Sequence, residues 1–289
     1  MPSITTPKLE ISYEEHNPGA RETIVFMHGF PDGVRTWDRV LAQPAFAGKR
    51  AIVPWTRGFG ATRFLDPSAP RTGGVAGFGR DVLDVLDTLG IERCTLVGHD
   101  WGARAGYAAA ILAPERIERL IAIAVGYAST PSGHGMDYDQ VHAYWYQWLF
   151  STPQGEATLR DDRRALCRYL WRSWSPSWRF DDTEFDETAT AWDNPDFVPV
   201  VLHSYRVRWG FVAPDPRDAD DERKLAGDPP IDVPTVVLHG AKDGVTMLSG
   251  TAGKERHFLS NYDRKVVPGA GHFVPREAPE AIAAAFALP

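Results

Sequence analysis

Short apolar runs alternate along the chain with longer segments that show helical periodicity. Six of these runs are rich in β-branched residues, and each is bounded by Gly, Pro or a charged residue. Such runs are typical of strands that are covered on both faces. The runs are TIVFMHG (23–29), RAIVPW (50–55), CTLVGH (94–99), IERLIAIAV (117–125), PTVVLHG (234–240) and RKVVPG (264–269). Their alternation with helical segments predicts an α/β fold, a mostly parallel sheet with crossover helices on both faces.

Two of the intervening segments predict helices of different kinds. GRDVLDVLDTLG (79–90) has a stripe of Val and Leu, and its aspartates, Asp81 and Asp84 among them, are expected to lie largely off that stripe. Gly90 is expected to end this helix, because glycine readily adopts the left-handed conformation of a C-terminal cap. AGYAAAILAP (105–114) predicts a helix of small residues that packs closely against the sheet.

Residues 131–228 break this alternation. The segment is rich in Trp, Tyr, Arg and Asp, and half of the ten tryptophans of the chain lie in its first half. It predicts several short helices joined by proline-containing turns, and both of its edges contain proline, as domain boundaries often do. We therefore expect a helical cap over 131–228, inserted into an α/β core formed by 1–130 and 229–289. The WSPSW motif at 174–178 lies in this segment, and the sequence alone indicates no role for it.

The composition narrows the class of protein. The chain has 289 residues, of which 43% are hydrophobic and 24% charged, enough to build a large core in a soluble unit. Its net charge of −7 disfavours nucleic acid and anionic membrane surfaces as partners. Cys94 and Cys167 form no metal-binding or disulfide pattern, and we find no secretory signal and no apolar run of about 20 residues. We expect a cytoplasmic globular protein without a membrane segment. Among the possible function classes, an enzyme is the first hypothesis.

The pentapeptide GHDWG at 98–102 is the most informative motif. It lies between the apolar run CTLV and the helix of small residues, the strand–turn–helix setting in which G-x-nucleophile-x-G exposes its central side chain. Gly98 and Gly102 allow close backbone packing around the turn. The central residue is Asp100, and a carboxylate is not a serine-type nucleophile but attacks an sp³ carbon to form an alkyl ester on the enzyme. For this motif alone, an ordinary Asp-Gly turn is an equal alternative.

A loop after the first predicted strand offers an oxyanion site. HGFP (28–31) closes that strand, where backbone N–H groups can point at a developing negative charge. The N–H groups of Phe30 and Trp101 are the natural pair for this role. His28 and Pro31 of the same loop are candidates to contact the substrate.

Candidates for a base and an acid follow the later strands. GHF (271–273) comes after the last strand and supplies His272 as the base. HGAKDG (239–244) directly follows another strand and supplies Asp243 as the acid that orients it. The other place for such an acid is the end of the preceding strand, where AVGYAST (124–130) has no carboxylate. The alternatives are a packed histidine and a turn-forming Asp-Gly pair, but the chain order of nucleophile, acid and histidine favours a catalytic triad.

Four motifs, taken together, carry a family resemblance. They are HGFPD (28–32), TRGFG (56–60), GHDWG (98–102) and GAGHF (269–273). In combination they resemble α/β-hydrolases of the epoxide hydrolase and dehalogenase branch, over essentially the whole chain. The resemblance implies the α/β-hydrolase fold, a cap inserted after the strand at 117–125 and a cis peptide between Phe30 and Pro31. Because a carboxylate and an imidazole supply the nucleophile and the proton transfer, we expect no metal and no cofactor.

Epoxide hydrolases that this chain resembles use two cap tyrosines to hydrogen-bond the epoxide oxygen. A phenol suits this role because it donates a proton to the opening alkoxide and is neutral at pH 7. The resemblance assigns the role to Tyr146, in a Tyr-Gln pair, and to Tyr205, in a Tyr-Arg pair. Tyr144 competes with Tyr146 for the first position. Simple packing is the alternative for every one of them, because 138–150 is densely aromatic.

Dehalogenases of the same branch share the triad, so the triad does not separate the two reactions. Haloalkane dehalogenases bind halide with tryptophan N–H groups, and Trp101 fits one of these, whereas fluoroacetate dehalogenases have two arginines, of which only Arg104 is present. Arg104 stands one helical turn after Asp100, where it can reach a substrate carboxylate or form a salt bridge on the helix. Gln147 and Trp148, further candidate substrate contacts, replace a His-Trp pair. The incomplete halide site and the two tyrosines favour epoxide opening, with haloalkane or haloacid dehalogenation second.

Two other classes receive less support. Ligand-binding relatives without catalysis usually lose a triad member, and all three are present. A nicotinamide-binding domain requires Gly-x-Gly-x-x-Gly after its first strand, where this chain has HGFPDG. The aromatic cap suggests an apolar small-molecule substrate, although aromatic residues of a core would give the same pattern. The sequence does not indicate the size, identity or stereochemistry of that substrate. A homodimer stays open as the oligomeric state.

Overall fold

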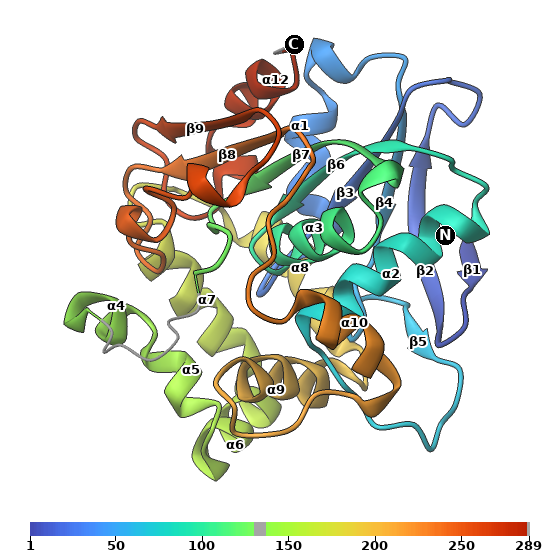
Figure 1. Cartoon of the computed structure of the whole chain (residues 1–289). Coiled ribbons are helices and arrows are strands. Elements are labelled where there is room, and N and C mark those ends of the chain that lie inside the picture. Colours follow the sequence, from blue (N-terminus) through green and yellow to red (C-terminus); the bar gives the residue numbers. More distant parts are fainter. Residues whose placement is uncertain (130–136, 288–289) are drawn as a thin grey trace.

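The computed structural model describes residues 1–129 and 137–287. Within these residues, nine strands form one sheet in the order β1-β2-β4-β3-β6-β7-β8-β9, with β5 paired to β2 (Figure 1). The strands are β1 (Ser3–Thr5), β2 (Leu9–His16), β3 (Thr23–Met27), β4 (Arg50–Pro54), β5 (Arg63–Phe64), β6 (Cys94–His99), β7 (Ile117–Ile123), β8 (Thr235–Gly240) and β9 (Tyr262–Val267). The neighbours from β4 to β9 pair in parallel, whereas β2 is antiparallel to β1, β4 and β5.

The parallel part of the sheet consists of the six apolar runs, each within two residues of its predicted limits. The predicted fold class is therefore confirmed at the level of the sheet. The sequence pattern missed the N-terminal antiparallel strands. The longest of them, β2, reads LEISYEEH, and its last three residues are exposed or half-buried. A strand of this kind has no continuous apolar run, because only one of its faces is covered for part of its length.

Helices cover both faces of the sheet (Figure 1). Those of the core are α1 (Asp38–Leu41), α2 (Val75–Thr88), α3 (Trp101–Leu112), α11 (Val274–Glu277) and α12 (Pro279–Phe286). Helix α3 packs against α2, β6 and β7, whereas α12 packs against α1, β7 and β8. The small residues of α3 allow this close contact with the sheet, as predicted: a Cβ on Gly106 would lie 2.6 Å from a methyl group of Leu120 on β7.

Helix α2 departs from its prediction on two points, its first residue and the burial of its aspartates. It starts at Val75 rather than at 79, and Gly90 has the expected left-handed conformation just after its end, with φ 62°. The expectation that Asp81 and Asp84 avoid the buried face is wrong, since both are buried. Arg57 explains Asp81, because its buried guanidinium donates to both carboxylate oxygens, at 2.7 and 2.6 Å. A buried arginine requires such an acid to offset the loss of hydration.

Between β7 and β8 the described part of the chain forms helices and no strand. These are α4 (Tyr138–Ala143), α5 (Trp145–Leu149), α6 (Pro153–Asp161), α7 (Arg163–Trp174), α8 (Asp182–Ala189), α9 (Phe197–Arg208) and α10 (Ala219–Leu225). The first predicted cap boundary, at 130–131, lies outside the described residues. After α10, pairing with the core begins again at Ile231, which bridges to Phe258.

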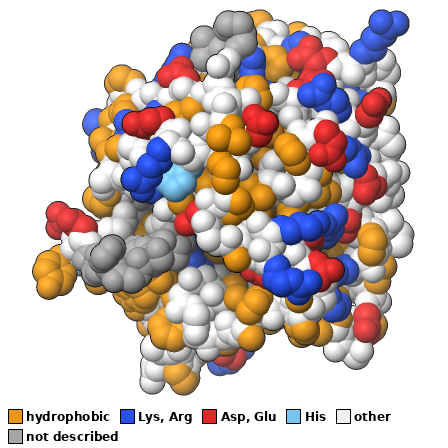
Figure 2. Space-filling view, in the orientation of Figure 1, with side chains coloured by type: hydrophobic (Ala, Val, Ile, Leu, Met, Phe, Trp, Pro, Cys, Tyr) orange, Lys and Arg blue, Asp and Glu red, His pale blue; other side chains and the backbone are white. Residues whose placement is uncertain are grey.

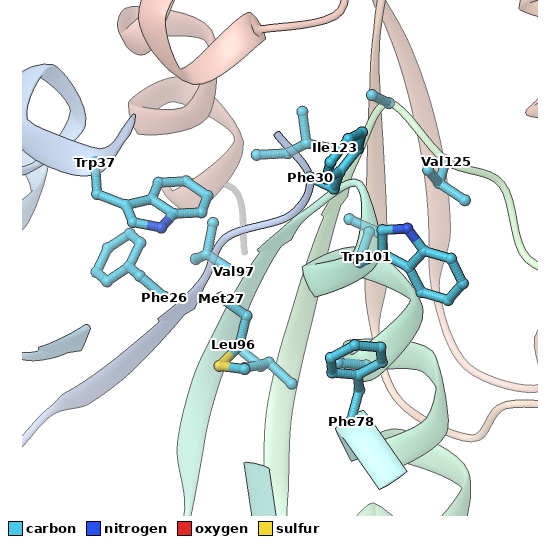
Figure 3. Packing of buried hydrophobic residues seen from close by; sticks show 14 of the residues in the cluster. Phe26, Met27, Phe30, Trp37, Phe78, Leu96, Val97, Trp101, Ile123 and Val125 are labelled. Atoms are coloured by element: carbon cyan, nitrogen blue, oxygen red, sulfur yellow. The ribbon is translucent and has the colours of Figure 1, made fainter. Parts of the chain in front are cut away.

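The core that supports the site lies around β3, β6 and β7. Phe26 of β3 packs on Trp37, with ring centroids 5.2 Å apart, and Phe78 of α2 packs on Trp101 of α3, at 5.6 Å. Figure 3 shows the two pairs on opposite sides of the strands. The carboxyl end of β6 is thus held between two apolar layers, and Trp101 begins the helix that follows it.

The surface carries charges of both signs. Figure 2 shows Lys and Arg side chains interspersed with Asp and Glu over the face in view, so the net charge of −7 is not gathered in one patch there. Among the described residues, no helix is long and apolar enough to span a membrane.

Candidate active site

Asp100 lies at the tight turn between β6 and α3. Its backbone has φ 53° and ψ −114°, a conformation that residues other than glycine rarely adopt. Two glycines make the turn possible: a Cβ on Gly98 would lie 2.3 Å from the carbonyl oxygen of Gly102, and one on Gly102 would lie 2.0 Å from that of Met27. The strand–turn–helix geometry expected for a nucleophile is present, and a carboxylate stands at its centre.

The two oxygens of the Asp100 carboxylate have different surroundings. Oδ1 accepts a hydrogen bond from the backbone N–H of Phe30 at 3.0 Å, while Oδ2 lies 3.8 Å from Nε2 of His272. The N–H of Trp101 is the first of α3 and has no acceptor within the helix. The peptide between Phe30 and Pro31 is cis, as the family resemblance implies. Of the two N–H groups expected to form the oxyanion site, that of Phe30 binds Asp100 and that of Trp101 belongs to the next residue in the chain.

His272 lies between two carboxylates. Its Nδ1 is 2.9 Å from Oδ2 of Asp243, and its Nε2 faces Asp100. The other oxygen of Asp243 accepts hydrogen bonds from the N–H groups of Val245 and Thr246, at 2.8 and 2.9 Å. Backbone groups thus fix the acid, and the acid orients the imidazole. All three residues of the expected triad come together, although their positions in the chain are far apart.

The Asp243–His272 pair shifts the two pKa values in opposite directions. Burial acts to lower the pKa of His272, but the charge of Asp243 and the hydrogen bond to it outweigh burial, so the pKa is raised. Burial acts to raise the pKa of Asp243, but the charge of His272 and contacts with His239 and His272 lower it below its usual value. Asp243 therefore stays ionised at neutral pH, and His272 is a stronger base than a free imidazole.

Tyr146 of α5 and Tyr205 of α9 lie beside the loop HGFP (28–31), which carries the expected oxyanion site and is called the oxyanion loop below. Their rings are 5.3 Å apart, and both rings contact that of Phe30. Tyr205 also packs edge to face on Trp101, at 5.3 Å. The Tyr205 hydroxyl is buried and has no hydrogen-bond partner among the described residues. Burial raises the pKa of both tyrosines, so both phenols are protonated at neutral pH and able to donate.

Tyr144 has different neighbours. Its ring lies 6.2 Å from that of Trp209, and the guanidinium of Arg208 lies 5.2 Å from its centroid. Tyr146 instead accepts a hydrogen bond from Nε2 of Gln147 at 2.7 Å, which leaves its own proton free to be donated. Of the two competing tyrosines, Tyr146 is the one that contacts the oxyanion loop.

The polar groups of His28 and Pro31 are used inside the protein. Nε2 of His28 accepts a hydrogen bond from the backbone N–H of Thr56 at 3.2 Å, and the imidazole is fully buried. The carbonyl of Pro31 accepts a hydrogen bond from Nε1 of Trp171 at 2.8 Å. These bonds hold the loop that carries Phe30.

Gln147 and Trp148 also have internal partners. Gln147 is buried, and besides its bond to Tyr146 it accepts a hydrogen bond from Nε1 of Trp209 at 2.8 Å. Nε1 of Trp148 donates to the carbonyl of Val141 at 3.2 Å. Gln147 therefore orients the Tyr146 hydroxyl, a role that the sequence analysis missed. The one available signal was its position directly after that tyrosine.

Arg104 lies one helical turn after the nucleophile. Its Nε is buried and has no hydrogen-bond partner in the described part of the chain, and its guanidinium lies 5.6 Å from a ring of Trp101. Burial and the nearby charge of Arg208 lower the pKa of Arg104 to about 10, so the side chain keeps its charge at neutral pH. It lines a cavity of about 110 Å³ together with Tyr107 and Tyr127. No salt bridge to Arg104 occurs among the described residues, so the one considered for it on the helix is absent there.

Apolar side chains surround the oxyanion loop closely. Phe30, Trp101 and Tyr205 line a cavity of about 10 Å³, which is room for about one water molecule. Among residues 1–129 and 137–287, no three His, Cys, Asp or Glu side chains are grouped in a way that would hold a metal ion.

Several known proteins are similar to this chain. A family model described as alpha/beta hydrolase fold matches residues 22–279. The solved structure of a candidate epoxide hydrolase from Klebsiella pneumoniae is 33% identical, with a TM-score of 0.91, and the match covers 99% of this chain and 95% of that one.

Curated epoxide hydrolases are also similar. That from Caballeronia sordidicola is 36% identical over 124 residues, which cover 41% of this chain and 36% of that protein. Epoxide hydrolase A from Mycobacterium tuberculosis is 25% identical over 299 residues, which cover 94% of this chain and 91% of that protein. The match to the Caballeronia sordidicola enzyme spans 36% of the length of that protein, and the match to epoxide hydrolase 2 from Siraitia grosvenorii spans 34%. The chain thus matches only about a third of the length of these two relatives.

Proposed function

The chain belongs to the alpha/beta hydrolase fold family, in its epoxide hydrolase branch, and on this premise we propose that it opens an epoxide to a vicinal diol. The observation that carries the proposal is the position of two buried tyrosine hydroxyls beside a carboxylate that also faces a histidine. Tyr146 and Tyr205 contact Phe30, whose N–H binds Asp100, and Asp100 faces His272. This arrangement combines a nucleophile, a base and two proton donors for the ring oxygen.

In the first step, Oδ2 of Asp100 attacks one carbon of the epoxide. Oδ1 is held by the N–H of Phe30, which leaves Oδ2, on the side of His272, as the attacking atom. A bond forms between Oδ2 and the carbon while the ring carbon–oxygen bond breaks, and the electron pair stays on the ring oxygen. Tyr146 or Tyr205 donates its proton to that oxygen, so no free alkoxide has to form. The product of this step is an alkyl ester on Asp100.

In the second step, a water molecule attacks Cγ of the ester. Nε2 of His272 takes one proton of the water, and Asp243 stabilises the resulting imidazolium. The negative charge that develops on Oδ1 is stabilised by the N–H groups of Phe30 and Trp101. The Cγ–Oδ2 bond then breaks, and the diol leaves with Oδ2 and the proton held by His272. The carboxyl group of Asp100 now contains one oxygen of the water. The second proton of that water passes from the carboxyl group to the deprotonated tyrosine and restores its hydroxyl.

We further propose that the helices between β7 and β8 form a cap that delivers the two tyrosines and limits the substrate to a small, apolar molecule. Aromatic side chains support this, since Phe30, Trp101 and Tyr205 border the reacting groups. Exclusion of bulk water by such a lid strengthens the electrostatic interactions within the site.

The test is the intact mass of a His272→Ala variant mixed with a panel of epoxides and halogenated acids. Without the base, attack by Asp100 is still possible but hydrolysis stalls, so the ester accumulates. We expect a mass gain equal to the whole epoxide, located on the peptide that contains Asp100. Asp100→Asn should give no gain, and His16→Ala, which changes an exposed histidine of β2, should turn over without accumulation.

Dehalogenation is the second candidate, and Arg104 is the observation that favours it. Its buried Nε has no hydrogen-bond partner among the described residues, and such a cation suits a substrate carboxylate, as in a halogenated acid. In that reaction Oδ2 of Asp100 displaces the halide, which leaves with the electron pair of its bond to carbon. The mass gain then equals the substrate minus hydrogen halide. A folded His272→Ala variant that forms no adduct with any compound of either class would count against both reactions.

A further inference from the structure

The WSPSW motif at 174–178 lies against the two loops that carry Asp243 and His272. The carbonyl of Trp174 accepts two hydrogen bonds, from the backbone N–H of Gly244 at 2.9 Å and from that of His272 at 3.1 Å. Gly244 directly follows Asp243. The indole of Trp174 also meets the imidazole of His272 edge to face, with centroids 5.1 Å apart. One residue of the helical segment therefore joins the backbone of the acid loop to that of the base loop.

Ser175 extends this connection. It is fully buried, and its Oγ accepts a hydrogen bond from the N–H of Phe273 at 3.1 Å and donates to Oε1 of Glu277 at 2.5 Å. The other carboxylate oxygen of Glu277 accepts from the N–H of Gly271 at 3.0 Å. Three consecutive N–H groups of the base loop are thus bound, by Glu277, Trp174 and Ser175 in turn.

Glycines in both loops permit this close approach. A Cβ on Gly271 would lie 2.5 Å from Oγ of Ser175, and one on Gly244 would lie 2.1 Å from the carbonyl oxygen of Ser173. Neither loop could come this near to the end of α7 with a larger residue at these positions.

The connection matters because His272 lies on no regular element. Strand β9 ends at Val267 and α11 begins at Val274, so the direction of the imidazole depends on the hydrogen bonds of the loop between them. A displacement of about 1 Å at a reacting group is enough to reduce a rate about 100-fold. Asp100, in contrast, is held by the glycine turn between β6 and α3.

We propose that Ser175 is a positioning residue for the base: its hydroxyl, with the carbonyl of Trp174, holds His272 aligned with Asp243 and directed at the ester carbonyl. The chemical consequence rests on the proposed function, because only hydrolysis of the ester uses His272. The alignment itself is a property of the free protein and is measured without substrate.

The first measurement uses the free protein. Ser175→Ala removes the hydroxyl, and Ser173→Ala is the matched control, because among the described residues that hydroxyl bonds only to the carbonyl of Leu170 within α7. In NMR spectra of labelled histidine, we expect Ser175→Ala to weaken the signal of the Nδ1 proton that His272 shares with Asp243. The same change should lower the pKa of His272, because contact with Asp243 raises that pKa. Ser173→Ala should leave both unchanged.

The second measurement separates the two half-reactions by rapid quenching and intact mass. With Ser175→Ala, ester formation on Asp100 should keep the wild-type rate, while ester hydrolysis slows about 10- to 100-fold, so the ester accumulates. Ser173→Ala should show wild-type rates for both steps. Where Ser175→Ala does not fold, Glu277→Gln serves as the second variant, because it keeps an acceptor for Gly271 but removes the charge that accepts from Ser175. Its readouts are the Nδ1 signal and the rates of the two half-reactions, because the charge of Glu277 itself raises the pKa of His272.

The outcomes are distinct. An unchanged signal and pKa of His272 in Ser175→Ala, or equal slowing of both half-reactions, would show that Ser175 only stabilises the fold. If the His272 signal changes as expected but even His272→Ala forms no ester, the alignment by Ser175 stands and the proposed function fails.

Discussion

Nε2 of His272 lies 3.8 Å from Oδ2 of Asp100, a separation at which two charges interact but do not share a hydrogen bond. On its other side the same ring contacts Asp243 at 2.9 Å. In the proposed reaction, formation of the ester removes the charge of Asp100 and leaves that of Asp243. The electrostatic environment of the base therefore changes between the two steps.

We expect the pKa of His272 to be lower in the ester than in the free protein. In the free protein burial lowers this pKa, while Asp243 and Asp100 both raise it, and the ester keeps only the first of these charges. Ester hydrolysis requires the neutral imidazole, so its rate rises as the pH passes through this pKa. The midpoint of single-turnover ester hydrolysis against pH should lie below the midpoint that NMR gives for the free protein. Equal midpoints would mean that the charge of Asp100 has no influence on the base.

Removal of the hydroxyl of Tyr146 or of Tyr205 should slow ring opening. We expect Tyr205→Phe and Tyr146→Phe to reduce the rate of ester formation about 100- to 10,000-fold, the range typical of a lost proton donor. Tyr144→Phe is the matched control, because that ring packs on Trp209 and beside Arg208. Single-turnover mass measurements give each rate. A large effect of Tyr144→Phe with none of Tyr146→Phe would exchange the roles of these two residues.

The sequence predicts those features that depend on residues close together in the chain. The turn around Asp100 is predictable because an apolar strand, two glycines and a helix of small residues lie within about twenty positions. The strand β2 lacks the continuous apolar run that identifies the buried strands, and its alternation of apolar and polar residues is instead the pattern of a strand covered on one face. The positions of Asp243 and His272 follow from strand ends, and the chain order of nucleophile, acid and histidine predicts that the two pair, whereas the distance between them comes from the structure.

Long-range polar contacts are what the sequence does not show. The buried pair of Arg57 and Asp81 places a carboxylate on the covered face of α2, where periodicity argues for an apolar residue. The bonds from the base loop to Trp174 and Ser175 join segments about 100 residues apart, and one of the acceptors is a backbone carbonyl. Every residue has a backbone carbonyl, so a hydrogen bond to one does not constrain the residue type and cannot be predicted from the pattern of side chains.

Arg104 should contact the carboxylate of a substrate that carries one, although apolar side chains border the rest of the site. We expect Arg104→Gln to raise KM about 10- to 100-fold for an epoxide with a carboxylate, the loss of one hydrogen bond to a charged group, with little change for its neutral methyl ester. Arg93→Gln, at an exposed position before β6, is the control. Steady-state kinetics with the matched acid and ester measure the difference. An equal change for the two substrates would exclude Arg104 as an anion contact.

Arg276 should contribute strongly to the stability of the site, because it is buried and donates to both oxygens of Asp32 and to Glu184. Arg276→Met leaves Asp32 buried without its cation, and we expect the free energy of unfolding to fall by about 3–5 kcal/mol at pH 7.

The effect of Arg276→Met should depend on pH through Asp32. In the wild type, burial raises the pKa of Asp32, but Arg276 outweighs burial and the pKa is lowered. Without Arg276 the hydrogen bond from the N–H of Gly33 still lowers this pKa, but burial is the largest influence, so Asp32 takes up a proton at a higher pH than in the wild type. The difference from the wild type therefore shrinks as the pH falls. Urea unfolding at neutral and acidic pH measures this. The control is Arg160→Met, from an exposed pair with Asp161, which should leave the free energy of unfolding nearly unchanged. A difference that persists unchanged at acidic pH would show that the unpaired charge of Asp32 is not its cause.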